Sequence, residues 1–170
     1  MNLSDLEDLY RHMEWADALV WHSVFESEEA CADQKVREYF YHLHLVQRAF
    51  LRAWRGEPRD TPYPTFDDIR SVMIWGRSYF SEVIAHFNTL TDKQISQLAQ
   101  LPWADIVEQE LGCKPENLSV AEMMLQVPLH SHYHRGQINA RLRAIGGEPA
   151  RVDYIVWVWL GRPAADWSFR

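Results

Sequence analysis

The sequence predicts an all-α fold, an antiparallel up-down bundle of four long helices. Four long stretches repeat apolar residues at spacings of three and four, which is the period of one helix face. The connections between them are modest in length, a feature typical of helix bundles. With 170 residues, 47% of them hydrophobic, the chain can bury a full core without a disulfide or a structural metal. We therefore expect residues 1–170 to form a single helical-bundle domain.

Two helices are expected in the first third of the chain. The first opens at Ser4, with Glu7 three residues later in the pattern of a capping box, and carries an apolar stripe to Val24. After a short break, the second helix carries its stripe from Val36 to Trp54. A glycine and several prolines follow, so this helix cannot continue.

The third helix is expected behind Thr65 and Asp68, which resemble an N-terminal cap, and its apolar stripe ends at Phe87. The two stretches that follow, residues 97–103 and 105–111, have no clear helical period. We expect them to form a small irregular or short-strand excursion between the third and fourth helices.

The fourth helix begins at a second capping-box pattern, formed by Ser119 and Glu122. Its apolar residues continue at helical spacing as far as Gly146, where we expect the helix to stop. Pro128 lies inside this pattern and should bend the helix. A short apolar segment, residues 154–160, follows and fits either a strand or a helix.

Charge and composition exclude several classes of function. A formal net charge of −7 disfavours a nucleic-acid surface, because phosphate binding needs a basic stripe. The two cysteines, Cys31 and Cys113, lie far apart and outside any CxxC pattern, so neither a disulfide scaffold nor a thiolate metal site is indicated. The sequence has neither a leader-peptide pattern nor an apolar run of ~20 residues. We expect a cytoplasmic protein with no membrane or nucleic-acid partner.

The fourth predicted helix contains three of the eight histidines. Counting about 100° per residue from Val127, His130 falls at about −60° and His134 at about −20°, both within the apolar stripe. His132 falls at about 140°, on the opposite side of the helix. His130 and His134 are therefore predicted to point into the bundle, one turn apart.

Two inward imidazoles on successive turns need polar partners, because burying their nitrogens unpaired is costly. A divalent metal ion can take both lone pairs, and the i, i+4 spacing suits chelation from one helix face. The alternative is a pair of core histidines, each bonded to a backbone carbonyl or a polar neighbour. The spacing excludes a zincin peptidase, since Ser131 stands where the glutamate general base would be.

A third metal ligand must come from another helix. His42 and His44 flank Leu43, the centre of the apolar stripe on the second helix, and lie about 100° to either side of it. Periodicity leaves the choice between these two histidines open. Three further histidines are interpreted as surface or boundary residues: His12, His22 and His86.

One motif of the fourth helix resembles a family signature. The run His130-x-x-x-His134-Arg-Gly-Gln-Ile, followed by Gly146-Gly147-x-Pro149 and then Asp153, is similar to that of the DinB-like (DinB/YfiT) superfamily of four-helix-bundle metalloenzymes. The opening Tyr10-x-x-x-x-Trp15-Ala16 resembles the first-helix pattern of the same family.

The second helix also resembles that family. His42 is followed by Gln47 and Phe50 at the family's spacing of five and eight residues, which favours His42 over His44 as the ligand. The resemblance implies a three-histidine site at one end of the bundle that binds Zn²⁺, Ni²⁺ or a similar ion. Its ligands would be His42, His130 and His134. The neighbouring His44 remains the alternative ligand, or a residue that contacts the ligands and orients them without binding the metal.

The chemistry of such a site suggests three functions. Three neutral imidazoles leave the ion its full charge and an open position, as in catalytic zinc sites. Characterised DinB-like proteins are often S-transferases or isomerases that use thiols such as bacillithiol or mycothiol. The resemblance thus implies activation of a low-molecular-weight thiol for attack on an electrophilic small molecule. The alternatives are a metal-dependent hydrolase and a non-catalytic, dimeric, stress-linked metal-binding bundle.

Further candidate residues flank the histidines. Arg135 and Gln137 lie about 80° to either side of the stripe centre, positions suited to orienting the ligands or contacting a substrate. An interhelical polar pair is the alternative for both. Gly136 falls opposite the stripe and indicates a close approach of another backbone. Three tryptophans are expected either to line a pocket mouth or to pack in the core: Trp15, Trp157 and Trp159.

The apolar segment 154–160 must pack on the bundle or on a partner chain, because it would otherwise expose a large apolar patch. We therefore expect a homodimer, which the family resemblance also implies.

Overall fold

The computed structural model describes residues 1–169 and is mostly helical. Its elements in chain order are α1 (Leu3–Phe25), α2 (Glu28–Ala32), α3 (Gln34–Trp54), α4 (Ile69–Phe87), α5 (Asp92–Ile95), β1 (Leu98–Ala99), α6 (Ala104–Leu111), β2 (Leu118–Ser119), α7 (Val120–Ala144) and α8 (Tyr154–Trp159). The predicted all-α class is confirmed at this level, because the two strands contain only two residues each. Within residues 1–169, no helix combines the length and apolarity needed to cross a bilayer.

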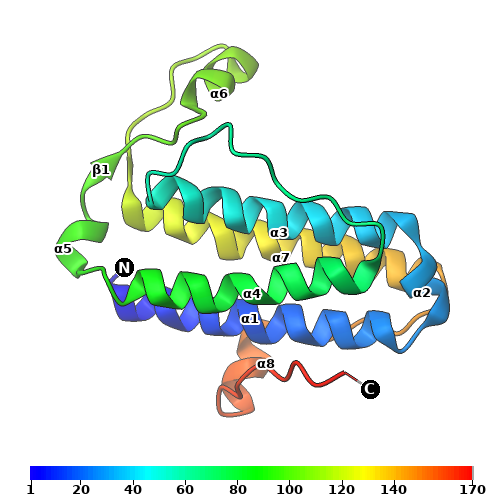
Figure 1. The fold of residues 1–170 in the computed structure, drawn as a ribbon. Helices are drawn as coiled ribbons and strands as arrows, with labels where there is room; N and C mark the ends of the chain where they lie inside the picture. The colour runs from blue at the N-terminus through cyan, green and yellow to red at the C-terminus, as the bar shows by residue number, and fades with distance from the viewer. Residues whose placement is uncertain (170) are drawn as a thin grey trace.

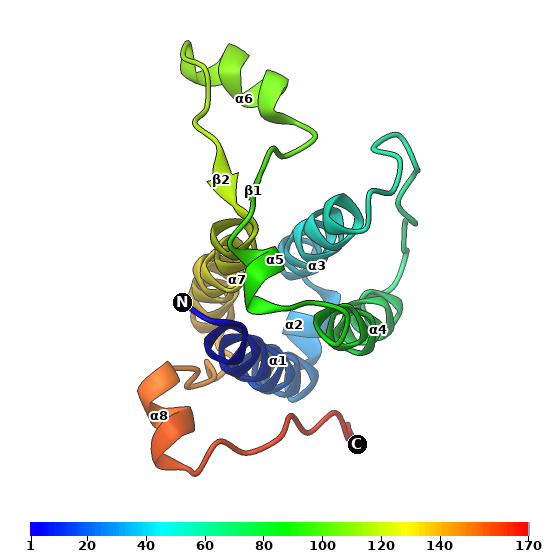
Figure 2. The same ribbon diagram turned by 90° about the vertical axis from the view of Figure 1, so that its left-hand side faces the viewer.

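The four long stretches with helical periodicity correspond to α1, α3, α4 and α7, which lie side by side (Figure 1). The view along their axes shows α1 beside α4 and α7, with α3 on the other side of the same two helices (Figure 2). Apolar side chains from all four helices meet between them, where they form the core. The contact between α3 and α7 brings together histidines from these two helices.

The directions of the four helices differ from the predicted up-down order. Arg37, near the start of α3, contacts Asp67 just before α4, and Arg55, just after α3, contacts Glu82 further along α4. Residue numbers therefore increase in the same direction along both helices, which are parallel. By the same criterion α1 and α7 are parallel, whereas α3 and α7 are antiparallel. The reason lies in residues 55–68, a connection long enough, at ~3.3 Å per extended residue, to return along the whole of α3.

Side-chain caps set the helix starts. α1 begins after Asn2, whose side chain accepts a hydrogen bond from the Asp5 backbone N–H, and not at the predicted Ser4 box. The capping box of Ser119 and Glu122 is present at the start of α7, as predicted. It fixes the first turn of the helix that carries His130 and His134.

An arm projects beyond the long helices between α5 and α7 (Figure 1). In it, Leu98–Ala99 pairs antiparallel with Leu118–Ser119. The prediction of short strands therefore holds for part of residues 97–103 but is wrong for residues 105–111, which form α6. The strand partner of β1 comes from further along the chain, and Gly112, with a positive φ of 69°, ends α6.

The C-terminal segment packs against α1. Residues 154–159 form α8, and its Trp157 ring lies 5.6 Å from the ring of His12. His12 is buried, and its Nε2–H donates a 2.9 Å hydrogen bond to the Val152 carbonyl. The prediction that His12 is a surface or boundary residue is therefore wrong, because periodicity within α1 cannot reveal a covering segment from the other end of the chain.

Candidate metal centre

The three histidines predicted to bind a metal lie together where α3 and α7 pack. His42 comes from α3, and His130 and His134 come from successive turns of α7. Each offers one ring nitrogen, and these three atoms lie within 4.8 Å of one another. The group could therefore hold a metal ion.

The local sequence explains this convergence. Residues four apart on a helix share one face, so His130 and His134 lie one above the other, with ring centroids 4.3 Å apart. Because α3 runs antiparallel alongside, His42 approaches both rings, at centroid distances of 5.5 Å and 4.6 Å. The cluster lies near the middle of α3 and α7, not at one end of the molecule as the resemblance implied.

The two histidines on α7 are held in the neutral form. Burial, reinforced by the nearby His134 and His42 rings, lowers the pKa of His130 to about 4. Burial also lowers the pKa of His134. Neutral imidazoles carry the lone pairs that a metal ion requires, so the site favours cation binding over protonation at neutral pH.

One nitrogen in the cluster has no hydrogen-bond partner among the described residues. The Nε2 atom of His130 is buried and unpaired. A buried polar atom left unsatisfied costs about 1–3 kcal/mol, so most such atoms in proteins have a partner. A metal ion shared with His42 and His134 would provide one.

A hydrogen bond orients His134. Its Nδ1 lies 2.6 Å from Oε1 of Gln137, and since an amide oxygen only accepts, Nδ1 carries the proton. Nε2 is therefore the free, unprotonated nitrogen of this ring. The Gln137 amide in turn donates a 3.3 Å hydrogen bond to the hydroxyl of Tyr133. Of the roles expected for Gln137, this geometry fits that of orienting a ligand.

The cluster is open on one side. His134 is buried, His130 is half-buried and His42 is exposed. A fourth ligand from solution can therefore approach from the His42 side. The group contains histidines only, with no carboxylate or thiolate to neutralise an ion.

This donor set fits a divalent ion such as Zn²⁺ or Ni²⁺, for which imidazole is a common ligand. In a tetrahedral site with bonds of 2.0–2.1 Å, neighbouring nitrogens are ~3.3 Å apart. The ring nitrogens here lie within 4.8 Å of one another, so each nitrogen–nitrogen distance must shorten by at most about 1.5 Å to reach that value. The exposed His42 side chain has room for that movement.

His44, the alternative ligand, lies in a different place. It is fully buried, and both of its ring nitrogens are in use. The indole N–H of Trp21 donates to Nε2 at 3.2 Å, and Nδ1–H donates to Oε1 of Gln47 at 2.9 Å. The choice of His42 over His44 therefore agrees with the geometry, and His44 belongs to a buried polar network behind the site.

Arg135 also lies away from the position predicted for it at a substrate edge. Its side chain is 1% exposed and donates a 2.6 Å hydrogen bond to Asp17, which is itself fully buried. The alternative interpretation, an interhelical polar pair, is the one that the structure shows. Sequence analysis did not single out Asp17, although a charged residue four positions from Met13 within an apolar stripe is a usable signal.

The prediction for Gly136 was wrong, whereas the core alternative for the tryptophans holds for two of the three. Gly136 does not mark a close backbone approach, because a Cβ atom there would meet nothing within 4 Å. The close approach occurs at Gly76 of α4, where a Cβ atom would lie 2.2 Å from Nε2 of His44. The three tryptophans share no pocket mouth, since two are buried in the core and one is 76% exposed: Trp15, Trp157 and Trp159.

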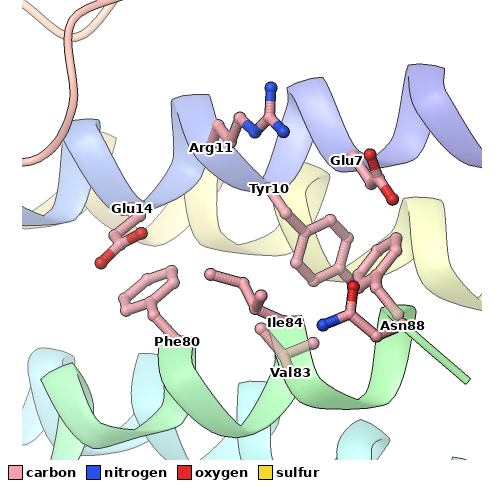
Figure 3. A pocket seen from close by; sticks show the side chains of 9 residues that line it. Glu7, Tyr10, Arg11, Glu14, Phe80, Val83, Ile84 and Asn88 are labelled. Carbon is pink, nitrogen blue, oxygen red and sulfur yellow. The ribbon is translucent and has the colours of Figure 1, made fainter.

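A separate cavity of about 220 Å³ lies between α1 and α4 (Figure 3). Apolar side chains of α4 form one wall, and charged side chains of α1 lie along the other. None of the three clustered histidines lines this cavity. Glu7, Tyr10 and Glu14 line it from α1, and Phe80 and Val83 line it from α4.

Comparison of the sequence with protein-family models and with curated proteins finds no match.

Proposed function

We propose that the three-histidine cluster binds a divalent ion, Zn²⁺ or Ni²⁺, and that the protein is a DinB-like four-helix-bundle enzyme. In this proposal, a low-molecular-weight thiol loses its S–H proton to solvent, and its sulfur, still bonded to the rest of the thiol, forms a new bond to an electrophilic carbon of a small molecule. The bond broken is the one from that carbon to its leaving group, or the π bond or ring bond that takes up the electron pair. The observation that carries the proposal is the convergence of one nitrogen each from His42, His130 and His134 within 4.8 Å. The fourth-helix motif that resembles the DinB-like signature contains two of these three residues.

Each residue would have a distinct role. His42, His130 and His134 would hold the ion. Oε1 of Gln137 would accept a hydrogen bond from Nδ1–H of His134, which keeps the proton on Nδ1 and leaves Nε2 with a lone pair for the ion. The exposed side of the cluster would admit the thiol. A bound divalent ion supplies positive charge, which lowers the pKa of a thiol at its open position enough to leave a nucleophilic thiolate.

The composition of the cluster favours thiol transfer over hydrolysis. Metal-dependent hydrolases commonly use a carboxylate beside the metal as general base, as in the zincin peptidases. The present cluster has histidines only, and Ser131 follows His130 directly. A thiolate needs no general base once it has formed. Thiol transfer can therefore proceed with the three histidines and the ion alone, whereas hydrolysis would also need a general base.

The test uses purified protein stripped with a chelator and reloaded with Zn²⁺ or Ni²⁺. The loaded protein is incubated with a panel of thiols and a panel of electrophiles, and the conjugates are measured by mass spectrometry. We expect thiol-dependent conjugation that is lost on stripping and in H134A but retained in H132A, because His132 is exposed on the opposite side of α7. Turnover of esters or amides without thiol would support the hydrolase instead, and metal binding without any turnover would support the non-catalytic bundle.

We also propose that two copies associate through α8. This short helix buries Trp157 but leaves Tyr154, Ile155 and Trp159 exposed, and the exposed Leu160 directly follows it. Sedimentation over a concentration series should show a dimer that W159K converts to monomer. The control I74K, at an exposed apolar residue of α4, should leave the dimer intact. A wild-type protein that remains monomeric at every concentration would contradict this proposal.

A further inference from the structure

A continuous hydrogen-bonded network runs through the interior behind the histidine cluster. The indole of Trp21 donates to His44, His44 donates to Gln47, and the Gln47 amide donates to Oδ2 of Asp17 at 2.9 Å. The guanidinium of Arg135 donates to the other oxygen, Oδ1, at 2.6 Å. Every one of these five residues is buried.

The donors and acceptors in this network fit in only one sense. An indole N–H can only donate, so Nε2 of His44 must accept and Nδ1 must carry the proton. That proton can only be given to the carbonyl oxygen of the Gln47 amide, whose NH₂ group then faces Asp17. The Asp17 carboxylate accepts from both sides. Between Trp21 and Asp17, a rearrangement would leave a buried group unpaired, so this part of the network strongly specifies one geometry. Nε of Arg135, at the end of the network, is buried without a partner among the described residues.

The network joins three helices at one level. Asp17 belongs to α1, Gln47 to α3 and Arg135 to α7. Gln47 also donates a 3.2 Å hydrogen bond to the hydroxyl of Ser131, which lies on α7 one turn before Arg135. α7 is therefore held by two polar contacts, from Ser131 and Arg135, spaced one helical turn apart.

These two contacts are adjacent to the two clustered histidines of the same helix. Ser131 directly follows His130, and Arg135 directly follows His134. The polar row and the histidine row thus run parallel on α7, about 100° apart around its axis. For a side chain at a radius of ~6 Å, a 20° rotation of the helix moves its tip by ~2 Å, about one metal–nitrogen bond length. Any rotation that breaks the polar contacts therefore carries the histidines away from His42.

We propose that Asp17, Arg135 and Gln47 are positioning residues that set the rotation of α7, so that His130 and His134 face His42 at metal-binding distance. This inference rests on the proposed metal-binding function. It assigns to the buried network a role beyond stability, because a purely structural pair could be replaced by apolar side chains without affecting the affinity for a metal.

The test compares two double variants. D17L/R135M replaces the buried pair by apolar side chains of similar size, a change that proteins often tolerate without loss of stability. D33N/R141M is the matched control. It removes a second Asp–Arg pair of α7, in which Arg141 NH2 lies 2.5 Å from Asp33 at the start of α3, while asparagine keeps the N-cap of α3. If D17L/R135M fails to fold, the single variant D17N takes its place in the same measurement.

The readouts are Co²⁺ affinity, by competition with a chromophoric chelator, the visible absorption of the bound Co²⁺, and the urea-unfolding midpoint of the metal-free protein. For D17L/R135M, we expect 10–100-fold weaker Co²⁺ binding and an altered absorption spectrum, with an unfolding midpoint near that of the wild type. D33N/R141M should bind Co²⁺ within twofold of the wild type.

Three results would overturn the inference, and they differ from one another. If the wild type binds Co²⁺ but the buried-pair variant binds it equally well, only the positioning role fails. Equal weakening in D33N/R141M would show that any polar link from α7 to a neighbouring helix suffices, and the assignment to this pair would be wrong. A wild type that binds no Co²⁺ would refute the proposed function, and the positioning role with it.

Discussion

The Nδ1 atom of His134 lies 2.6 Å from Oε1 of Gln137, one turn further along α7. This contact leaves Nε2 as the unprotonated nitrogen of His134, a residue that offers one ring nitrogen within 4.8 Å of nitrogens of His42 and His130. A ligand held in one tautomer and one orientation loses less conformational freedom when a metal binds. The four-residue run from His134 to Gln137 thus contains both a proposed ligand and the group that would orient it.

Replacing Gln137 by leucine should weaken metal binding. Q137L removes the acceptor for Nδ1–H, so His134 can rotate or exchange tautomers, and we expect Zn²⁺ affinity to fall by about 10–100-fold. Because Gln137 is only half-buried, the unfolding free energy of the metal-free protein should change by less than about 1 kcal/mol. Q126L, at an exposed glutamine of the same helix, is the control and should bind normally. Equal affinities of Q137L and wild type in a chelator competition would show that Gln137 does not orient the ligand.

Alanine substitutions at two helical glycines should have opposite effects on stability. At Gly76 a Cβ atom would lie 2.2 Å from Nε2 of His44, within a fully packed interior, so G76A should destabilise the protein by about 1–3 kcal/mol. At Gly136 the same atom would meet nothing, and G136A should stabilise α7 by about 0.5–1 kcal/mol. Urea unfolding of the two variants measures both effects. A G76A protein as stable as G136A would mean that the contact between α4 and His44 is looser than described.

Acidification should destabilise the fold through His12. Burial lowers the pKa of His12 from 6.5 to about 4, although its hydrogen bond to Val152 acts in the opposite direction. Between these two values the unfolded chain binds the proton and the folded chain does not, so the unfolding free energy falls as the pH falls. This contribution is fully present above pH 6.5 and is lost as the pH approaches 4. At about 1.4 kcal/mol per pKa unit, it amounts to at most about 3–4 kcal/mol.

The variant H12Q isolates that contribution, because glutamine can still donate to the Val152 carbonyl but does not titrate. Unfolding free energies of wild type and H12Q are measured in chelator-containing buffer between pH 7 and pH 4.5, where the other histidines contribute equally to both proteins. We expect the wild-type curve to fall more steeply. Parallel curves for the two proteins would rule out His12 as a source of acid sensitivity.

The parts of the fold that follow local rules could be predicted from the sequence. The period of apolar residues located the four long helices, and the pattern of Ser119 with Glu122 located the start of α7. The i, i+4 spacing placed His130 and His134 on one face, and the motif match selected His42 over His44. Each of these inferences depends on residues within one or two turns of each other.

Features that depend on contacts between distant segments could not be predicted. The direction of α4 relative to α3 is set by the path of residues 55–68. The periodicity of α3 and α4 does not show whether this connection turns back at the end of α3, which would make the helices antiparallel, or runs back along α3, which makes them parallel. The burial of His12 depends on α8, which lies about 140 positions later in the chain. The burial of Arg135 likewise depends on a distant segment, because its partner, Asp17, belongs to a different helix.

The central claim is that His42, His130 and His134 share one metal ion, and X-ray absorption spectroscopy of the Zn²⁺-loaded protein tests it most directly. We expect one equivalent of zinc per chain with three imidazole nitrogens at about 2.0–2.1 Å. The count should fall to two in H42A and stay at three in H44A preparations that remain folded. A wild-type protein that retains no stoichiometric zinc after loading, or whose zinc has an unchanged imidazole count in H42A, would contradict the account.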